Sequence, residues 1–173
     1  MNTPADLRGV EIGWPTAQVG GPAPDFDLPV LLSGVKSRLR LRDELKEKNV
    51  VLAFYPGNWE VVSAKQMTEY QKQRERFKQQ GAEVVGISVD SIMNTTVWER
   101  VIGPLDFPIC SDFWPHGTVS RSYGVFRTQD AGQGKSERAI IVISRAGTIT
   151  FRKAYADGEL PPIAETWEAL RCL

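Results

Sequence analysis

The sequence predicts an α/β fold in which helices cover both faces of a mixed β-sheet. A continuous apolar run at 50–55 is typical of a central strand that is buried on both sides, and 83–90 predicts a second central strand. Helical segments separate the strands, and this alternation predicts right-handed crossovers and a parallel central sheet. A hairpin signal within 138–152 adds antiparallel strands at the end, so the sheet must be mixed.

Composition agrees with one globular domain and excludes some partners. The 173 residues are 42% hydrophobic and 24% charged, which is ordinary for a chain that can bury a core. Basic and acidic residues both number 21, so we expect neither a nucleic-acid partner nor a membrane surface. No apolar run approaches the roughly 20 residues of a membrane span, and the first residues lack a secretory signal. We therefore expect a cytoplasmic protein.

The N-terminal part predicts an arm followed by the first strand. Residues 1–22 mix proline, glycine and isolated apolar residues without a period, which indicates an extended arm before a domain of residues 23–173. An alternating piece at 23–29, closed by a proline, predicts a short strand, and 42–46 predicts one or two helical turns.

The following segments alternate between helix and strand. A helix is expected over 62–80 because its apolar residues fall on one face, and Gly81 stands where a helix C-cap is expected. The strand at 83–90 ends in an Asp-Ser pair that can open the next helix, at 94–101. The remaining expected elements are an extended piece at 107–110, a helix at 115–123 entered through proline and stopped by Gly124, hairpin strands at 138–144 and 148–152, and a closing helix at 162–170.

Several short motifs follow one another in order over residues 19–152: Val19-Gly20, 23–28, 54–56, 86–90, Phe107-Pro108, 111–117, 123–125 and 137–139. This ordered set resembles the alkyl hydroperoxide reductase/thiol-specific antioxidant (peroxiredoxin) family, and residues 113–117 are similar to its one-cysteine subgroup. The resemblance implies a thioredoxin-like fold, thiol-dependent peroxide reduction without a cofactor, and a thiol reductant as partner if the chain is active. It also implies a possible homodimer, since relatives often dimerise.

The resemblance also places the family's catalytic loop on this chain. In the family this loop is proline, three residues, threonine or serine, two residues and cysteine. Here the proline is Pro56, but the hydroxyl position holds Glu60 and the cysteine position holds Ser63, while the family's arginine matches Arg138. Serine has neither an accessible anion near neutral pH nor a stable state equivalent to a sulfenic acid. With these residues we expect no peroxidase cycle at Ser63.

Glu60 changes the chemistry of the same loop. A carboxylate only accepts hydrogen bonds, and its charge raises the pKa of a neighbouring thiol. We therefore hypothesise that Glu60 pairs with Arg138 and fills the vacant anion pocket. The favoured function is a non-catalytic family member with a binding or structural role. The alternatives are a thiol peroxidase whose cysteine at 63 was exchanged for serine, and redox activity through Cys110 and Cys172. The second substitution in the loop favours natural divergence.

Other candidate residues have plain structural explanations. Cys110 stands where the family has an apolar residue, which favours a buried thiol, and Cys172 lies next to the chain end. The only histidine, His116, is typical of a surface residue at a helix start, so a serine hydrolase with Ser63 and His116 is disfavoured, as is a zinc site. Trp59 and Trp114 are consistent with either a pocket or dimer edge, or core packing.

Overall fold

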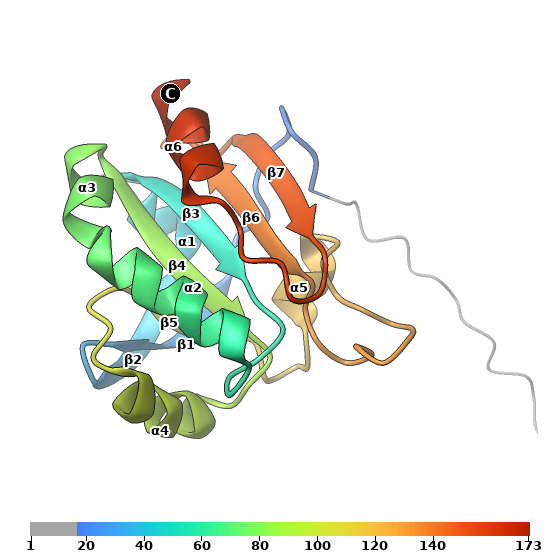
Figure 1. Ribbon diagram of the computed structural model, residues 1–173. Helices are drawn as coiled ribbons and strands as arrows, with labels where there is room; N and C mark the ends of the chain where they lie inside the picture. The colour runs from blue at the N-terminus through green and yellow to red at the C-terminus, as the bar shows by residue number, and fades with distance from the viewer. Residues whose placement is uncertain (1–16) are drawn as a thin grey trace, which may run out of the picture.

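The computed structural model describes residues 17–173, which form seven strands and six helices (Figure 1). In chain order they are β1 (Asp27–Leu32), β2 (Val35–Arg40), α1 (Leu41–Glu44), β3 (Asn49–Phe54), α2 (Val61–Lys72), α3 (Arg74–Gln79), β4 (Ala82–Ser88), α4 (Ile92–Ile102), β5 (Ile109–Ser111), α5 (Thr118–Ser122), β6 (Arg138–Ile143), β7 (Ile149–Tyr155) and α6 (Ile163–Arg171).

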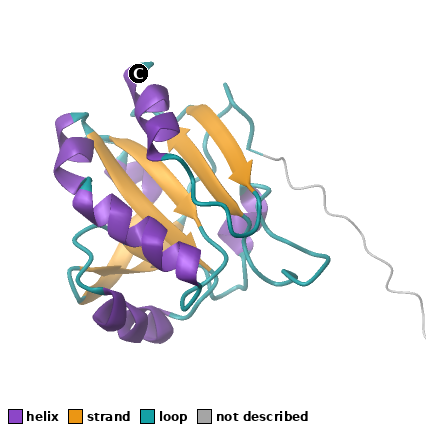
Figure 2. Ribbon diagram, in the orientation of Figure 1, coloured by secondary structure: helices purple, strands orange, loops and turns teal. Residues whose placement is uncertain are grey.

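All seven strands belong to one mixed sheet with the order β2-β1-β5-β4-β3-β6-β7 (Figure 2). The three central strands β3, β4 and β5 run parallel, as helical crossovers require. β6 lies antiparallel to β3, and β7 lies antiparallel to β6. The mixed sheet that the sequence predicts is therefore confirmed.

The sheet separates two clusters of buried side chains. Successive residues of a strand point to opposite faces, so β3 contributes to both clusters. Val50, Leu52 and Phe54 pack with residues of α1 and α5. Val51 and Ala53 pack on the other face with residues of α2, α3, α4 and α6. Helices cover both faces, which explains why 50–55 is apolar without alternation.

The N-terminal hairpin differs from the sequence-based expectation. β1 passes through Pro29 and ends at Leu32 rather than at the proline, because β5 pairs only with Val30 and Leu31 and leaves the proline outside that ladder. β2 was not expected, since it is an edge strand with four exposed residues and no apolar alternation. The β1–β2 hairpin reverses the chain, so β1 is antiparallel to β5 rather than part of the parallel set.

Two of the predicted helices have different bounds. The single helix expected over 62–80 is interrupted at Gln73, whose ψ of 3° separates α2 from α3. The helix expected from Pro115 begins only at Thr118, because Gly117 adopts a left-handed φ of 69° just before it. Gly81, with φ 62°, follows the end of α3 as predicted. The other elements agree to within a few residues.

Most of the predicted N-terminal arm lies outside the described residues. In the part that is described, Gly20 and Gly21 exchange backbone hydrogen bonds with Ile149 at the start of β7. Within residues 17–173, no helix combines the length and the apolar character needed to cross a membrane.

Candidate functional site

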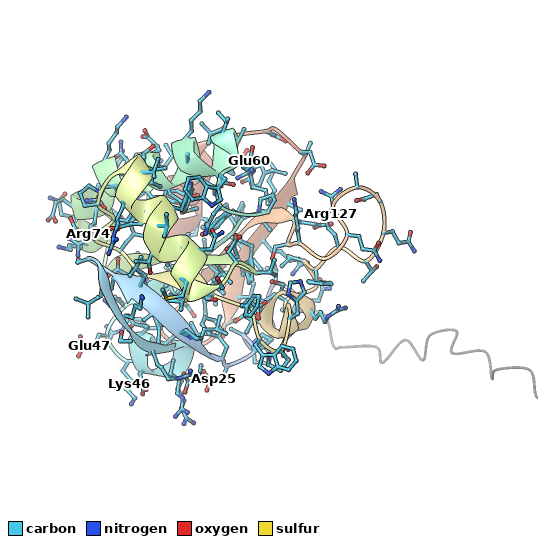
Figure 3. All side chains as sticks on the ribbon, turned by 90° about the horizontal axis from the view of Figure 1, so that it is seen from below. Asp25, Lys46, Glu47, Glu60, Arg74 and Arg127 are labelled. Carbon is cyan, nitrogen blue, oxygen red and sulfur yellow. The ribbon has the colours of Figure 1, made fainter. Side chains whose placement is uncertain are left out.

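The candidate site lies where β3 ends and α2 begins. The connection contains Pro56, which is partly buried, and it ends at Glu60, the N-cap residue of α2. The Glu60 carboxylate accepts hydrogen bonds from the backbone N–H groups of Val62 (3.0 Å) and Ser63 (2.7 Å). Glu60 thus satisfies two of the N–H groups that a helix N-terminus leaves unpaired, and its charge suits the helix dipole. Figure 3 labels Glu60 at this end of α2.

Arg138, the first residue of β6, reaches the same carboxylate. Its Nη2 lies 2.6 Å from Glu60 Oε2, and its Nη1 donates to Gln66 Oε1 at 2.7 Å. The Arg138 side chain is 1% exposed, whereas the Glu60 side chain is 37% exposed. The ion pair that the sequence analysis expects is therefore present, and it joins a buried guanidinium to a partly exposed carboxylate.

Ser63 lies between these two charged groups and is fully buried. Its Oγ donates to Glu60 Oε2 at 2.6 Å, and the two Nη atoms of Arg138 lie 3.4 and 3.5 Å from the same Oγ. Glu60 therefore receives two backbone N–H groups, a hydroxyl and a guanidinium. These donors are the kind that hold an anionic ligand at a helix N-terminus, and here a side chain of the chain itself occupies them.

The hydrogen bonds control the charge of Glu60. Burial alone would raise the pKa of its carboxyl, but the hydrogen bonds from the Ser63 hydroxyl, the Val62 N–H and Arg138 outweigh that effect. Together they lower the pKa of Glu60 to about 2. A carboxylate with so low a pKa stays ionised at neutral pH and is a weak general base for the Ser63 hydroxyl.

The loop before Glu60 is fixed to the beginning of α4. The Asn58 N–H donates to Asp90 Oδ2 at 2.8 Å, and the Asn58 side chain donates to Asn94 Oδ1 at 2.9 Å. Trp59 Nε1 donates to the same Asn94 oxygen at 3.1 Å, although 53% of Trp59 is exposed. The structure thus excludes core packing for Trp59. The sequence analysis did not single out Asn58, Asp90 or Asn94.

Gln66 is a second residue that the sequence analysis missed. It is 1% exposed and follows Ser63 by three residues, so it lies on the inward face of α2 beside Tyr70. Gln66 Nε2 donates to the Tyr70 hydroxyl at 3.1 Å. Hydrogen bonds therefore run without interruption from Tyr70 through Gln66 and Arg138 to Glu60. A polar residue on the apolar face of a predicted helix is the signal that identifies Gln66.

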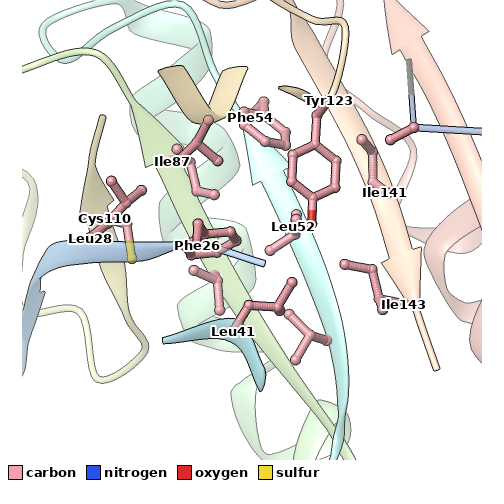
Figure 4. Close-up of a cluster of buried hydrophobic side chains, with 14 of the residues drawn as sticks. Phe26, Leu28, Leu41, Leu52, Phe54, Ile87, Cys110, Tyr123, Ile141 and Ile143 are labelled. Carbon is pink, nitrogen blue, oxygen red and sulfur yellow. The ribbon is translucent and has the colours of Figure 1, made fainter. Parts of the chain in front are cut away.

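The two cysteines lie on opposite faces of the sheet. Cys110, in β5, is fully buried in the cluster that contains residues of α1 and α5 (Figure 4), and burial raises the pKa of its thiol far above the ordinary range. Cys172 caps α6, which packs on the other face, and is exposed. Both thiols are free. These positions agree with a structural role for Cys110.

The remaining candidates do not gather at Ser63. His116 is exposed, and its Nε2 lies 2.7 Å from the Gly134 carbonyl oxygen, while the Ser63 hydroxyl faces Glu60. Trp114 is 79% exposed, so core packing is wrong for this residue too. Among residues 17–173, no three His, Cys, Asp or Glu side chains converge as metal ligands.

The chain is similar to known proteins over most of its length. The AhpC/TSA family profile matches residues 19–152. Alkyl hydroperoxide reductase E of Mycobacterium tuberculosis is 32% identical over 142 residues, which are 82% of this chain and 88% of that protein. Peroxiredoxin-2 of Macaca fascicularis is 32% identical over 161 residues, which are 90% of this chain and 77% of that protein.

Solved structures agree on the fold. The reduced 2-Cys peroxiredoxin of Plasmodium vivax superposes with a TM-score of 0.81 at 22% identity, over 88% of this chain and 80% of that one. Mycobacterium tuberculosis AhpC gives a TM-score of 0.79 at 22% identity, over 91% and 93% of the two chains. At this identity the likeness establishes the thioredoxin-like α/β fold of peroxiredoxins. The profile match and the two relatives show that the chain is a member of the AhpC/TSA family.

Proposed function

We propose that this chain is a non-peroxidatic member of the AhpC/TSA family with a binding or structural role. One observation carries the proposal: the Glu60 carboxylate engages Arg138, the Ser63 hydroxyl and the N–H groups at the start of α2. By the family's loop spacing, Ser63 stands at the peroxidatic cysteine position and Glu60 at the hydroxyl position. Both the nucleophile and the peroxide-binding donors are then unavailable.

The chemistry of the two residues supports this proposal. Peroxide reduction needs a thiolate that attacks the O–O bond and is oxidised to a sulfenic acid, and a serine hydroxyl cannot follow that course. A peroxide would also have to displace a carboxylate that four donors hold. Cys110 is a poor substitute nucleophile, because burial raises the pKa of its thiol.

A peroxide-consumption assay with dithiothreitol tests the proposal. We expect the natural chain to give no turnover above the rate of dithiothreitol alone. In the variant with Ser63→Cys and Glu60→Thr, we expect turnover: the introduced thiolate takes the distal peroxide oxygen and becomes a sulfenic acid, and the alkoxide leaves and is protonated. Dithiothreitol then reduces the sulfenic acid to the thiol, releases water and becomes a disulfide.

Glu60 itself is tested by comparing single and double variants. Ser63→Cys alone should turn over about tenfold more slowly than the double variant, because the Glu60 carboxylate raises the pKa of the adjacent thiol and occupies the hydrogen-bond donors of the site. A matched control combines Ser63→Cys with Glu47→Thr, since Glu47 is an exposed glutamate elsewhere on the chain. Turnover by the natural chain would refute the proposal, and its loss on Cys110→Ser or Cys172→Ser would assign the activity to that thiol.

We also infer that the chain assembles as a homodimer. The solvent side of α4 carries Met93, Val97 and Val101, which are 61%, 51% and 68% exposed. Beside it lie Trp59, in the loop before α2, and Val61, the first residue of α2, at 53% and 68%. Residues four apart share one helix face, so these side chains form an exposed apolar stripe. An exposed apolar stripe of this kind is typical of a protein–protein contact.

Sedimentation velocity tests the homodimer. We expect a dimer for the natural chain and a monomer for Val97→Asp combined with Val101→Asp, because two carboxylates cannot be buried unpaired in an apolar contact. Val19→Asp is the control, since Val19 is 57% exposed and the next residue, Gly20, pairs with Ile149 of β7, the edge strand of the sheet opposite β2. A natural chain that sediments as a monomer would contradict the inference.

A further inference from the structure

A cavity of about 570 Å³ lies between α2 and residues 160–163, the segment that leads into α6. Figure 1 shows this segment crossing the face of the sheet that α2 also covers. The volume is within the range of small-molecule sites. Neither Glu60 nor Ser63 lines the cavity, although Gln66, which accepts a hydrogen bond from Arg138, does.

One wall of the cavity is apolar. It consists of Leu160, Pro161, Pro162 and Ile163, and Leu160 is 42% exposed. Proline has few conformations to lose, so the two prolines form a stiff surface. This wall suits the hydrocarbon part of a ligand, because covering it removes apolar surface from water.

The opposite rim, on α2, carries two ammonium groups. Lys65 and Lys72 are both exposed and line the cavity. They are about two helical turns apart in sequence, so they lie on one face of the helix, about 10 Å apart along its axis. Neither lysine takes part in an ion pair within the described part of the chain. Glu69, between them, accepts a hydrogen bond from the Gln73 side chain at 3.3 Å. Two lysines and one glutamate leave this rim with a net positive charge, which favours an anionic group.

A buried hydroxyl group on the floor of the cavity donates no hydrogen bond within the described residues. Tyr70 and Gln66 line the cavity and are 3% and 1% exposed. Gln66 Oε1 accepts from Arg138, so the Gln66 amide group must be the side that faces the Tyr70 hydroxyl and must donate to it. The phenolic proton of Tyr70 then has no acceptor among residues 17–173. A buried hydroxyl without an acceptor favours a ligand that brings one.

We propose that this cavity binds an amphipathic monocarboxylic acid whose apolar body carries an oxygen acceptor, such as a keto group. The carboxylate lies at the rim with Lys65 or Lys72, the apolar body lies along residues 160–163, and the acceptor takes the Tyr70 proton. Binding here goes beyond the proposed function, since it involves no chemistry at Ser63. The Gln66 side chain connects the floor to Arg138, so an occupied cavity lies one hydrogen bond from the candidate site.

Isothermal titration calorimetry of the full chain with dodecanoic acid and with a keto-substituted dodecanoic acid tests the proposal. We expect the natural chain to bind both acids, and the keto acid more tightly. Leu160→Glu should weaken both by about tenfold or more, because it places a carboxylate in the apolar wall. Val35→Glu changes an exposed apolar residue outside the cavity and should leave both affinities unchanged.

Two further variants separate the polar contacts. Lys65→Glu combined with Lys72→Glu should weaken both acids, whereas the control Lys135→Glu should weaken neither. Tyr70→Phe keeps the aromatic ring and removes only the hydroxyl, so it should abolish the preference for the keto acid and leave dodecanoic acid unaffected. No binding by the natural chain, or equal binding by Leu160→Glu, would overturn the proposal. The calorimetry contains no peroxide. Turnover in the separate peroxide-consumption assay would therefore reject the proposed function without changing the outcome of this binding test.

Discussion

Glu60 joins three features that a shorter side chain could not connect: the cap of α2, the buried guanidinium of Arg138 and the Ser63 hydroxyl. Within the described residues, Glu60 is the only carboxylate paired with Arg138. A buried charge that loses its partner is strongly unfavourable, because the protein interior solvates it poorly. The Glu60 carboxylate therefore stabilises the structure around Arg138.

The contacts of the Glu60 carboxylate predict how the stability of the Glu60→Gln variant depends on pH. The pKa of Glu60 in the folded protein, about 2, lies below its ordinary value of 4.5. Its contribution to stability is therefore complete above pH 4.5 and is lost as the pH falls toward 2. We expect Glu60→Gln to lower the free energy of unfolding by about 1–2 kcal/mol at pH 7. The difference from the natural chain should shrink between pH 4.5 and 2.

Urea denaturation at several pH values measures that difference. Glu47→Gln is the matched control, because Glu47 is exposed and has no ion pair within residues 17–173. Its stability should follow that of the natural chain at every pH. A Glu60→Gln variant that loses stability with acid as steeply as the natural chain would show that the carboxylate does not act through its charge.

Short elements in this fold depend on contacts from elsewhere in the chain. α5 has five residues, too few for a helix to be stable alone. The buried Asp112 carboxylate accepts hydrogen bonds from the Val119 N–H at 3.1 Å and from the Ser120 N–H at 2.8 Å. Burial raises the pKa of Asp112 even though these hydrogen bonds act in the other direction. The carboxylate thus acts as a cap for α5 from outside the helix.

We expect removal of this cap to lower the stability of the protein and to affect α5 most. Asp112→Ala leaves two buried N–H groups without an acceptor, so we expect the free energy of unfolding to fall by about 2–4 kcal/mol. Amide hydrogen exchange should show the loss of protection first in residues 118–122. The control Asp43→Ala removes an exposed aspartate and should change the stability little. Equal effects of the two substitutions would refute a capping role for Asp112.

The sequence predicted those features that depend on residues close together in the chain or on the family loop. The central strand at 50–55 was predictable because burial on both faces makes every residue apolar. The Glu60–Arg138 pair was predictable from the family loop and the charges. β2 could not be predicted, because its exposed charged residues resemble a loop, and its Arg38 and Arg40 pair with Asp27 across the hairpin. Gln66 carries a local signal, a polar residue on an apolar helix face, but its contact with Arg138 could not be predicted because the two residues are 72 positions apart.

At the scale of the whole molecule, strand register brings the site together. Glu60 and Arg138 are 78 positions apart in the chain. β6 pairs antiparallel with β3, and Ala139 lies opposite Phe54, the last residue of β3. Arg138 therefore stands beside the chain where it leaves the sheet for α2. Any sequence that preserves this register carries the arginine to the same place, whatever residues fill the loop.

The Glu60–Arg138 pair also makes substitutions at positions 60 and 63 interdependent. Glu60→Thr alone would leave a buried guanidinium unneutralised and would add no nucleophile. Ser63→Cys alone would place a thiol against a carboxylate, which disfavours its ionised form. Each single substitution therefore costs stability or gains little activity. Under the proposed function, selection acting on one substitution at a time would find thiol chemistry in this loop difficult to establish.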